Sequence, residues 1–309
     1  MARHPVSARA AAATALARRW ALDSPLVAAG CVLGGVLLFA TQDMLSKVLV
    51  VDYSPLEIAW VRYGINTILI LPFMVRHHGR ALRTRVPLLQ GARSLAVLTS
   101  AVIFMAGLGY LPQADATSIS FLSPLLVTAL SIPLLGEKVG IRRWTAVAIG
   151  FVGMLVIVRP GSSAFQLPAL LPIASASFWA LALVLTRRLG VSEAGLTTLT
   201  YSTVLPAVIL TLLLPFFWRT PDARAVILML AIGVVSVLAQ YLTILGYSKR
   251  PASSLAPLTF TQLVWATMYG YLVFDAIPGP WTWLGAAIIV ASGLYTFRRE
   301  RIVRARRTG

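Results

Sequence analysis

Apolar residues run along this chain in long stretches, separated by short links that carry proline, glycine and charged residues. Ten such stretches can be delimited: Leu26–Val50, Pro55–Val75, Leu88–Leu108, Ala114–Leu135, Arg143–Val158, Pro168–Thr186, Thr197–Trp218, Val226–Tyr247, Ala252–Phe274 and Trp281–Phe297. A helix of about 20 apolar residues crosses a lipid bilayer. None of the stretches alternates as a half-buried strand does. The pattern therefore predicts an all-α integral membrane protein with ten transmembrane helices.

Composition supports a membrane location. Charged residues make up 12% of the chain, hydrophobic residues make up 58%, and the mean hydropathy is +0.81. Soluble domains carry roughly 25% charged residues. The links between the stretches are too short to hold a soluble domain, so the lipid bilayer is the expected partner of most of the surface.

The basic residues predict the direction of each helix. If the N-terminus is cytoplasmic, the inner links and tails hold 21 Lys and Arg, the outer links hold 3, and 3 more lie within spans. Cytoplasmic loops are enriched in Lys and Arg. A single missed span would invert every later link and destroy this strict alternation. Both termini are therefore predicted to be cytoplasmic, in the inner membrane of a cell.

The net charge of +17 does not indicate nucleic-acid binding, because the basic residues lie in short clusters between apolar stretches. Such clusters are typical of helix ends held at an anionic leaflet. Residues 1–24, rich in Ala and Arg, are interpreted as a cytoplasmic tail, with a targeting segment as the alternative. Residues 298–309 form a second basic tail. Cys31 is the single cysteine, so no internal disulfide forms.

The two halves of the chain resemble each other. The matched pairs are Tyr110 with Tyr247, Ala114 with Ala252, Glu137 with Asp275, Trp144 with Trp283, Ala146 with Gly285, and Gly153 with Ser292. Upstream, Phe39–Lys47 matches Trp179–Arg187. Each half holds five predicted spans, and an odd number places the second half upside down relative to the first. Inverted repeats of this kind are typical of carriers that alternate around a central site.

The run "ADATSISFLSPLLVTALSIPLLGEKVGIRRWTAVAIGFVGMLVIVRPG" (Ala114–Gly161) resembles the end of an EamA domain of the drug/metabolite transporter superfamily. The run "ASSLAPLTFTQLVWATMYGYLVFDAIPGPWTWLGAAIIVASG" (Ala252–Gly293) and the start "FATQDMLSKVLV" followed by "WVRYG" are similar to the same family. The resemblance implies two EamA repeats, at residues 25–161 and 166–297. The second half departs from the pattern at Phe274-Asp275, and it has Gln262 where the first half has Pro124.

From this resemblance we expect ten helices, cytoplasmic termini, a central cavity and alternating access without ATP. The expected function is secondary transport of a small organic metabolite, first of all export of an amino acid or related compound. The alternative is import of a vitamin or nucleoside-like metabolite such as riboflavin or S-adenosylmethionine. The family does not fix the substrate or the direction, and the chain is expected to be a monomer or homodimer.

Buried ionisable groups are the sharpest chemical signal, because a charge at mid-membrane costs about 2.5 kcal/mol or more. Asp43 and Lys47 are four residues apart, so they share a helix face and can pair; Gln42 and Ser46 lie beside them. Arg62 falls at similar depth on the next helix. The hypothesis is one network near the outer half of the cavity, acting as a gate or as a site for a carboxylate or ammonium group. A structural helix clamp, with Lys47 reaching outward, is the alternative.

Polar and aromatic residues on other helices complete the candidate site. The hydroxyl groups either join helices or line a wet cavity. Aromatic and amide groups suit an amphipathic organic solute. The members are Ser120, Phe121, Pro124 and Thr128 in the fourth stretch, Thr261, Gln262, Trp265 and Tyr269 in the ninth, and Trp179, Gln240 and Tyr241 in the sixth and eighth.

The sequence offers little for catalysis. The three histidines, His4, His77 and His78, lie in the tail or a cytoplasmic link, and no His, Cys and acid cluster has metal-ligand spacing. No phosphate-binding Gly-rich motif is present. We therefore expect no catalytic residue, metal or cofactor. An intramembrane enzyme and a channel or receptor are weaker alternatives, since neither requires an inverted repeat.

Overall fold

The computed structural model describes residues 25–76, 83–136, 141–160, 167–189, 195–249 and 252–308, and every regular element within these ranges is helical. The expected tail at residues 1–24 lies outside the described residues. The elements are α2 (Pro25–Leu49), α3 (Pro55–Arg76), α4 (Pro87–Tyr110), α5 (Gln113–Ser120), α6 (Ser123–Leu135), α7 (Ile141–Val158), η2 (Leu167–Ala169), α8 (Leu170–Leu189), α9 (Gly195–Leu213), η3 (Leu214–Phe216), α10 (Ala223–Lys249), α11 (Ala252–Thr259), α12 (Thr261–Phe274) and α13 (Pro280–Thr308).

Within the described residues, six helical stretches are long and apolar enough to cross a membrane. They are Leu26–Leu49, Pro87–Tyr110, Gln113–Leu135, Leu167–Leu189, Thr197–Phe216 and Ala223–Lys249. Two shorter apolar helices, Trp144–Val158 and Pro280–Tyr295, accompany them. An all-helical chain with this many apolar helices is a multi-pass membrane protein.

The fourth and ninth predicted spans are each interrupted near the middle. In the first half α5 ends at Ser120 and α6 begins at Ser123. Pro124 lies in the first turn of α6, and a proline ring clashes with the carbonyl of the residue four positions earlier, here Ser120. In the second half the break falls at Phe260, where proline does not explain it, because Gln262 stands in place of Pro124.

The last helix also runs further than predicted. The tenth span was expected to end at Phe297, but α13 continues to Thr308. The sequence from residue 298 to 308 contains neither glycine nor proline and is rich in arginine, a good helix former. The expected basic tail is therefore a continuation of the helix.

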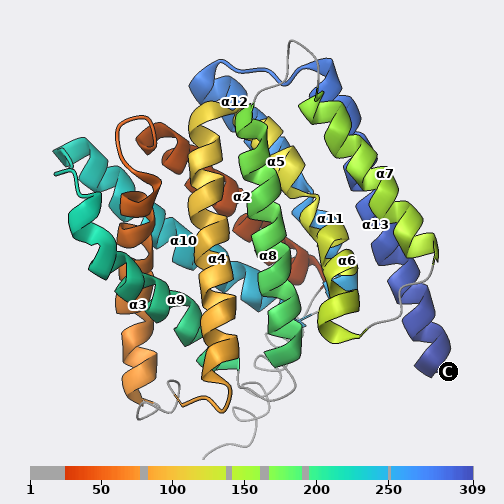
Figure 1. Ribbon diagram of the computed structural model, residues 1–309, viewed down its shortest axis with the longest axis horizontal. Helices are drawn as coiled ribbons and strands as arrows, with labels where there is room; N and C mark the ends of the chain where they lie inside the picture. Colours follow the sequence, from red (N-terminus) through yellow and green to blue (C-terminus); the bar gives the residue numbers. More distant parts are fainter. Residues whose placement is uncertain are drawn as a thin grey trace, which may run out of the picture.

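The helices pack mainly across the two halves of the chain. In Figure 1, α4 and α8 lie side by side in the middle, α7 and α13 form one edge, and α3 and α9 lie at the opposite edge. The long helix α10 packs against α2, and α12 also packs against α2. Almost every helix of the first half thus has a main partner in the second half.

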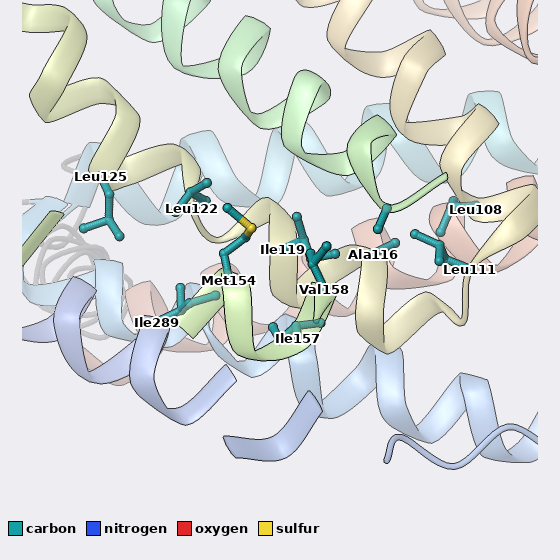
Figure 2. Packing of buried hydrophobic residues seen from close by; sticks show 11 residues of the cluster. Leu108, Leu111, Ala116, Ile119, Leu122, Leu125, Met154, Ile157, Val158 and Ile289 are labelled. Carbon is teal, nitrogen blue, oxygen red and sulfur yellow. The ribbon is translucent and has the colours of Figure 1, made fainter. Parts of the chain in front are cut away.

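The core next to α7 is formed by side chains from both halves. Figure 2 shows Met154 and Ile157 of α7 beside Ile289 of α13. Leu122 and Leu125, at the α5–α6 break, belong to the same cluster of buried residues. The interrupted helix is therefore packed against the α7–α13 pair.

Close approach of α7 and α13 depends on glycine. A Cβ atom built on Gly153 would lie 2.9 Å from the carbonyl oxygen of Gly285. Two turns away, the Ser292 hydroxyl donates a hydrogen bond to the carbonyl oxygen of Ala146. Small residues let transmembrane helices approach closely and bond across the interface.

Replacing Gly153 with leucine should therefore push α7 away from α13 and destabilise the protein by about 1–3 kcal/mol, the usual cost of overpacking. The melting temperature of the purified protein in detergent measures the effect. Gly30→Leu is the matched control, since a Cβ atom at Gly30 has nothing within 4 Å. Equal melting temperatures for the two variants would contradict the close contact.

Two helix ends show how the halves correspond. Gly136 follows α6 and Asp275 follows α12, and both adopt the left-handed conformation, with φ of 68° and 50°. Glycine adopts this conformation without strain, and Asp is among the few other residues that tolerate it. Asp275 thus corresponds in structure to Gly136. The sequence comparison matched it with Glu137, one residue further along.

Candidate functional site

The C-terminal half of α2 holds Asp43, the one acid among the predicted site residues. Asp43 is 8% exposed, and its Oδ2 accepts a hydrogen bond of 3.2 Å from the side-chain amide of Gln262. The Arg62 guanidinium on α3 lies within electrostatic range of the same carboxylate. Arg62 belongs to the first half of the chain, and Gln262 lies on α12 in the second half. Asp43 on α2 therefore links the two halves.

A second polar contact joins the same pair of helices. The hydroxyl groups of Thr41 on α2 and Tyr269 on α12 are 2.7 Å apart. Thr41 also donates to the carbonyl oxygen of Leu37, one turn earlier. We call the residues Thr41, Asp43, Gln262 and Tyr269 the α2–α12 seam. Hydrogen bonds in this seam satisfy polar groups that hydrocarbon would leave unpaired.

Lys47 takes a different direction from Asp43. Its ammonium donates to the carbonyl oxygens of Leu108 and Leu111, both at 2.6 Å, at the C-terminal end of α4. The same ammonium lies 5.2 Å from the centre of the Phe274 ring on α12. The last carbonyls of a helix have no partner within the helix, and they carry the negative end of its dipole. Lys47 therefore ties the C-terminal ends of α2, α4 and α12 together.

The three charges of the hypothesised network thus have separate principal contacts. Asp43 bonds to α12, Lys47 bonds to α4, and Arg62 stacks at 4.6 Å on the ring of its neighbour Tyr63. Lys47 joins α2 to α4 through backbone carbonyl oxygens and not through the ion pair with Asp43 that its spacing suggested. Gln42 is also buried, at 6% exposed, with its backbone oxygen bonded by Ser46.

Several polar residues at this site were missed from sequence. Gln113 at the start of α5 is fully buried and donates to the carbonyl oxygen of Ala40 at 2.9 Å. Asp115, two residues on, lies within electrostatic range of Lys47. Asn66 on α3 accepts a hydrogen bond of 2.9 Å from Ser236 on α10. The polar character of these residues within apolar stretches was the available signal.

Some buried polar atoms near the seam lack a partner. Within the described part of the chain these include the Oε1 atom of Gln113, the hydroxyl of Thr117 and the indole nitrogen of Trp265. An unpaired buried polar group costs about 1–3 kcal/mol. Groups of this kind can form hydrogen bonds with a polar solute that reaches them.

The remaining predicted residues fall into three settings. The hydroxyls of Ser120 and Thr128 donate to carbonyl oxygens within their own helices, and that of Thr261 donates across the α11–α12 break to the carbonyl oxygen of Leu258. Phe121 meets Phe260 with ring centres 5.0 Å apart, so the breaks of the two interrupted spans touch. Pro124 and Gln240 are partly buried, whereas Trp179 and Tyr241 are 43% and 61% exposed.

The geometry therefore defines a polar seam inside an otherwise apolar helical bundle. Among the described residues, no group of three or more His, Cys, Asp or Glu could hold a metal ion. The seam joins the halves through amide and hydroxyl groups around one buried acid, Asp43. A multi-pass membrane protein with such an interior belongs to the class of solute transporters rather than to that of membrane anchors.

The chain belongs to the EamA-like transporter family, which matches it twice, at residues 26–159 and 166–298. It is 26% identical over 287 residues to an S-adenosylmethionine uptake transporter of Rickettsia felis, covering 93% of this chain and 98% of the relative. It is 30% identical to a riboflavin transporter of Vibrio cholerae, covering 87% and 92%. It is 28% identical to a pseudopaline exporter of Pseudomonas aeruginosa, covering 85% and 93%.

A solved crystal structure shares the fold, with a TM-score of 0.56 at 18% identity, covering 87% of this chain and 98% of that one. The family and the relatives identify a membrane transporter for a small molecule rather than an enzyme.

Proposed function

We propose that this protein is a secondary transporter that takes up a nucleoside-like metabolite by alternating access between two inverted five-helix repeats. The observation that carries the proposal is the α2–α12 seam, a buried acid and its amide partner contributed by opposite halves. In an alternating-access carrier the substrate binds where the repeats meet. Asp43, Gln262 and Tyr269 are assigned to substrate binding, with Trp265 and Phe121 nearby.

Ten spans in two repeats are supported by the double family match and by the contacts of α7 with α13. The repeat matches Ala146 with Gly285 and Gly153 with Ser292. A two-fold repeat requires that, if Gly153 contacts Gly285, the matched residues Ser292 and Ala146 are in contact as well. Both contacts occur. In the same way α2 corresponds to α8 and α10 corresponds to α4. The packing of α2 on α10 therefore has its counterpart in the packing of α8 on α4.

A nucleoside-like substrate is supported by the chemistry of the seam. Asp43 offers a negative charge to a cationic group, and Gln262 offers an amide for a heterocycle. Tyr269, Trp265 and the Phe121–Phe260 pair offer aromatic faces. The relatives named for S-adenosylmethionine uptake and for riboflavin transport handle heterocyclic solutes of this size. Cation–aromatic contacts contribute about 0.5–2 kcal/mol.

Export of an amino acid or related compound is the second candidate. It is supported by the relative named as a pseudopaline exporter. The same seam would then bind an ammonium group. In both cases we place the protein in the inner membrane with both termini cytoplasmic, since Lys and Arg concentrate in the links assigned to that side.

Ligand binding tests the substrate class. S-adenosylmethionine or riboflavin should raise the melting temperature of the purified protein, because a ligand that binds only the native state stabilises it; at 100 times its dissociation constant the gain is about 2.7 kcal/mol. Asp43→Asn should remove most of the shift given by a cationic ligand. A shift given by amino acids alone would favour the second candidate, and shifts that persist unchanged in Asp43→Asn would remove Asp43 from the site.

A further inference from the structure

An arginine in the second turn of α4 reaches between α8 and α9. Arg93 is partly buried. Its Nε donates to the hydroxyl of Thr186 on α8 at 2.9 Å, and its Nη1 donates to the backbone oxygen of Thr198 on α9 at 3.2 Å. A guanidinium carries five N–H groups, so three are left without a bond to a described residue. Both acceptors are neutral oxygens, which position the guanidinium without compensating its charge.

Among the residues that the structure describes, no carboxylate forms an ion pair with Arg93. The ionisable group within electrostatic range is Tyr63 on α3, a phenol. Buried charges in proteins are normally paired, and a charge within a membrane span usually marks the path of a solute or an ion. The geometry therefore leaves room for a ligand to supply the negative charge.

Two further polar side chains adjoin Arg93 on α4. Gln90 and Ser94 are four residues apart, so they share a face of the helix, and both are 0% exposed. The Gln90 Nε2 donates to the hydroxyl of Thr198 at 3.2 Å, so Gln90 and Arg93 converge on the same residue. The Oε1 of Gln90 and the hydroxyl of Ser94 have no hydrogen-bond partner within the described structure. We call Gln90, Arg93 and Ser94 the α4 polar cluster.

Helix contacts show which residues of the second half correspond to this cluster. A Cβ atom on Gly107 would lie 3.2 Å from Pro172, and one on Gly246 would lie 2.6 Å from Val32. Val32 and Pro172 are 140 residues apart, the interval at which α3 and α9 also begin, so the two glycines correspond at an interval of 139. The contacts thus shift the sequence match in this helix by two residues.

The counterparts of the polar residues are apolar. At these intervals Gln90, Arg93 and Thr198 correspond to Met229, Ile232 and Ile58. All three counterparts are at most 2% exposed and belong to one hydrophobic cluster. Apolar side chains therefore satisfy the same helix packing in the other half, and the fold does not require a polar cluster on α4.

We propose that the α4 polar cluster binds the α-amino acid end of the transported solute. Arginine binds a carboxylate through two parallel hydrogen bonds. The Ser94 hydroxyl can donate to the same carboxylate, and the Gln90 Oε1 can accept a hydrogen bond from the ammonium group beside it. One cation balances the single charge of a carboxylate, whereas a phosphate group carries about 1.5 to 2 charges at neutral pH.

This inference rests on the proposed function, because the transported solute supplies the carboxylate, and it narrows the class of substrate. S-adenosylmethionine carries an α-amino acid group, as do the amino acids of the second candidate, and riboflavin has none. The cluster therefore favours a solute that is an amino acid or contains one.

The cluster is separate from the α2–α12 seam. Leu108, whose carbonyl oxygen binds Lys47 beside the seam, is 15 residues further along α4 than Arg93. Fifteen residues of α-helix rise about 22 Å. A solute therefore contacts the seam and the cluster one after the other. In the proposed orientation the cluster lies toward the cytoplasm, where an imported solute leaves and an exported solute enters.

Ligands that differ only at the carboxyl group test the proposal. The pairs are S-adenosylmethionine with its decarboxylated form, and L-methionine with L-methioninamide. Calorimetric titration of the protein in phosphatidylcholine nanodiscs should show at least about tenfold tighter binding of the carboxylate member, the effect of losing a hydrogen bond to a charged group. Arg93→Met should abolish the preference and Arg93→Lys should restore part of it. Arg76→Met is the matched control, since Arg76 ends α3 and is exposed.

Equal affinities within both pairs, or a preference that persists in Arg93→Met, would overturn the proposal. So would displacement of the carboxylate ligand from the wild-type protein by inorganic phosphate or by phosphatidylglycerol in the nanodisc, because Arg93 would then be a site for free phosphate or for a lipid headgroup. Asp43→Asn should weaken binding of cationic ligands and keep the preference for the carboxylate. If S-adenosylmethionine and riboflavin fail to bind while the methionine pair shows the Arg93-dependent preference, the proposed substrate fails and this inference stands.

Discussion

Replacing Asp43 with asparagine is expected to lower the rate of substrate transport at least about tenfold while the protein stays folded. Asparagine has nearly the same shape and can still bond to the Gln262 amide, so packing at the seam should survive. The change removes the buried negative charge. A hydrogen bond to a charged group contributes about 1.5–3 kcal/mol, and 1.4 kcal/mol corresponds to a factor of ten in affinity.

Initial uptake rates in proteoliposomes, measured at equal protein incorporation, give the effect. Asp52→Asn is the matched control, because Asp52 is exposed and contributes only its backbone oxygen. It should transport at the wild-type rate. Wild-type transport by Asp43→Asn would exclude Asp43 from the mechanism and leave the α2–α12 seam a structural contact.

Replacing Lys47 with methionine is expected to destabilise the protein by about 2–4 kcal/mol, the largest loss of stability among the variants considered. The change removes two bonds of 2.6 Å from a cation to the carbonyl oxygens of Leu108 and Leu111. The two carbonyl oxygens at the end of α4 thereby lose the hydrogen-bond donor that Lys47 provides. Methionine fills a similar volume, so lost packing contributes little.

The melting temperature in detergent or nanodiscs measures this loss. Lys47→Arg should recover much of the stability, since arginine also donates to carbonyl oxygens and stacks on aromatic rings such as Phe274. A Lys47→Met variant as stable as the wild type would mean that the C-terminal ends of α2, α4 and α12 do not depend on these contacts of Lys47.

The helices were predictable because the bilayer imposes a strong rule on sequence. A segment that crosses hydrocarbon must satisfy its own backbone and cover it with apolar side chains. The long stretches starting near Leu26 and Leu88 therefore coincide with α2 and α4 to within about three residues. The breaks at Phe121 and Phe260 were not predicted, because hydropathy does not report backbone continuity.

The site was predictable in its residues more than in its contacts. Asp43, Gln262 and Tyr269 stood out as polar groups within apolar stretches, and the fold brings them to one seam. Spacing along one helix suggested that Asp43 pairs with Lys47. The unsatisfied carbonyls of α4, more than 60 residues away in the chain, bind Lys47 instead, and local spacing contains no information about them.

Glu57 illustrates the same limit. From sequence it was one acid at the start of a span, with nothing to distinguish it from an exposed residue. Its burial depends on the α9–α10 link, which brings Arg219 and Trp218 to the α2–α3 turn. Only the three-dimensional arrangement reveals that this carboxyl group is fully covered.

The central claim, that the protein carries a solute by alternating access, is tested most directly by counterflow in proteoliposomes. Vesicles are loaded with an excess of unlabelled S-adenosylmethionine or riboflavin and diluted into a trace of the same labelled compound, with no ion gradient. A carrier exchanges one solute for the other, so labelled solute should accumulate transiently above its outside concentration and saturate with substrate. Label that only equilibrates, without an overshoot and in proportion to concentration, would indicate a channel and contradict the account.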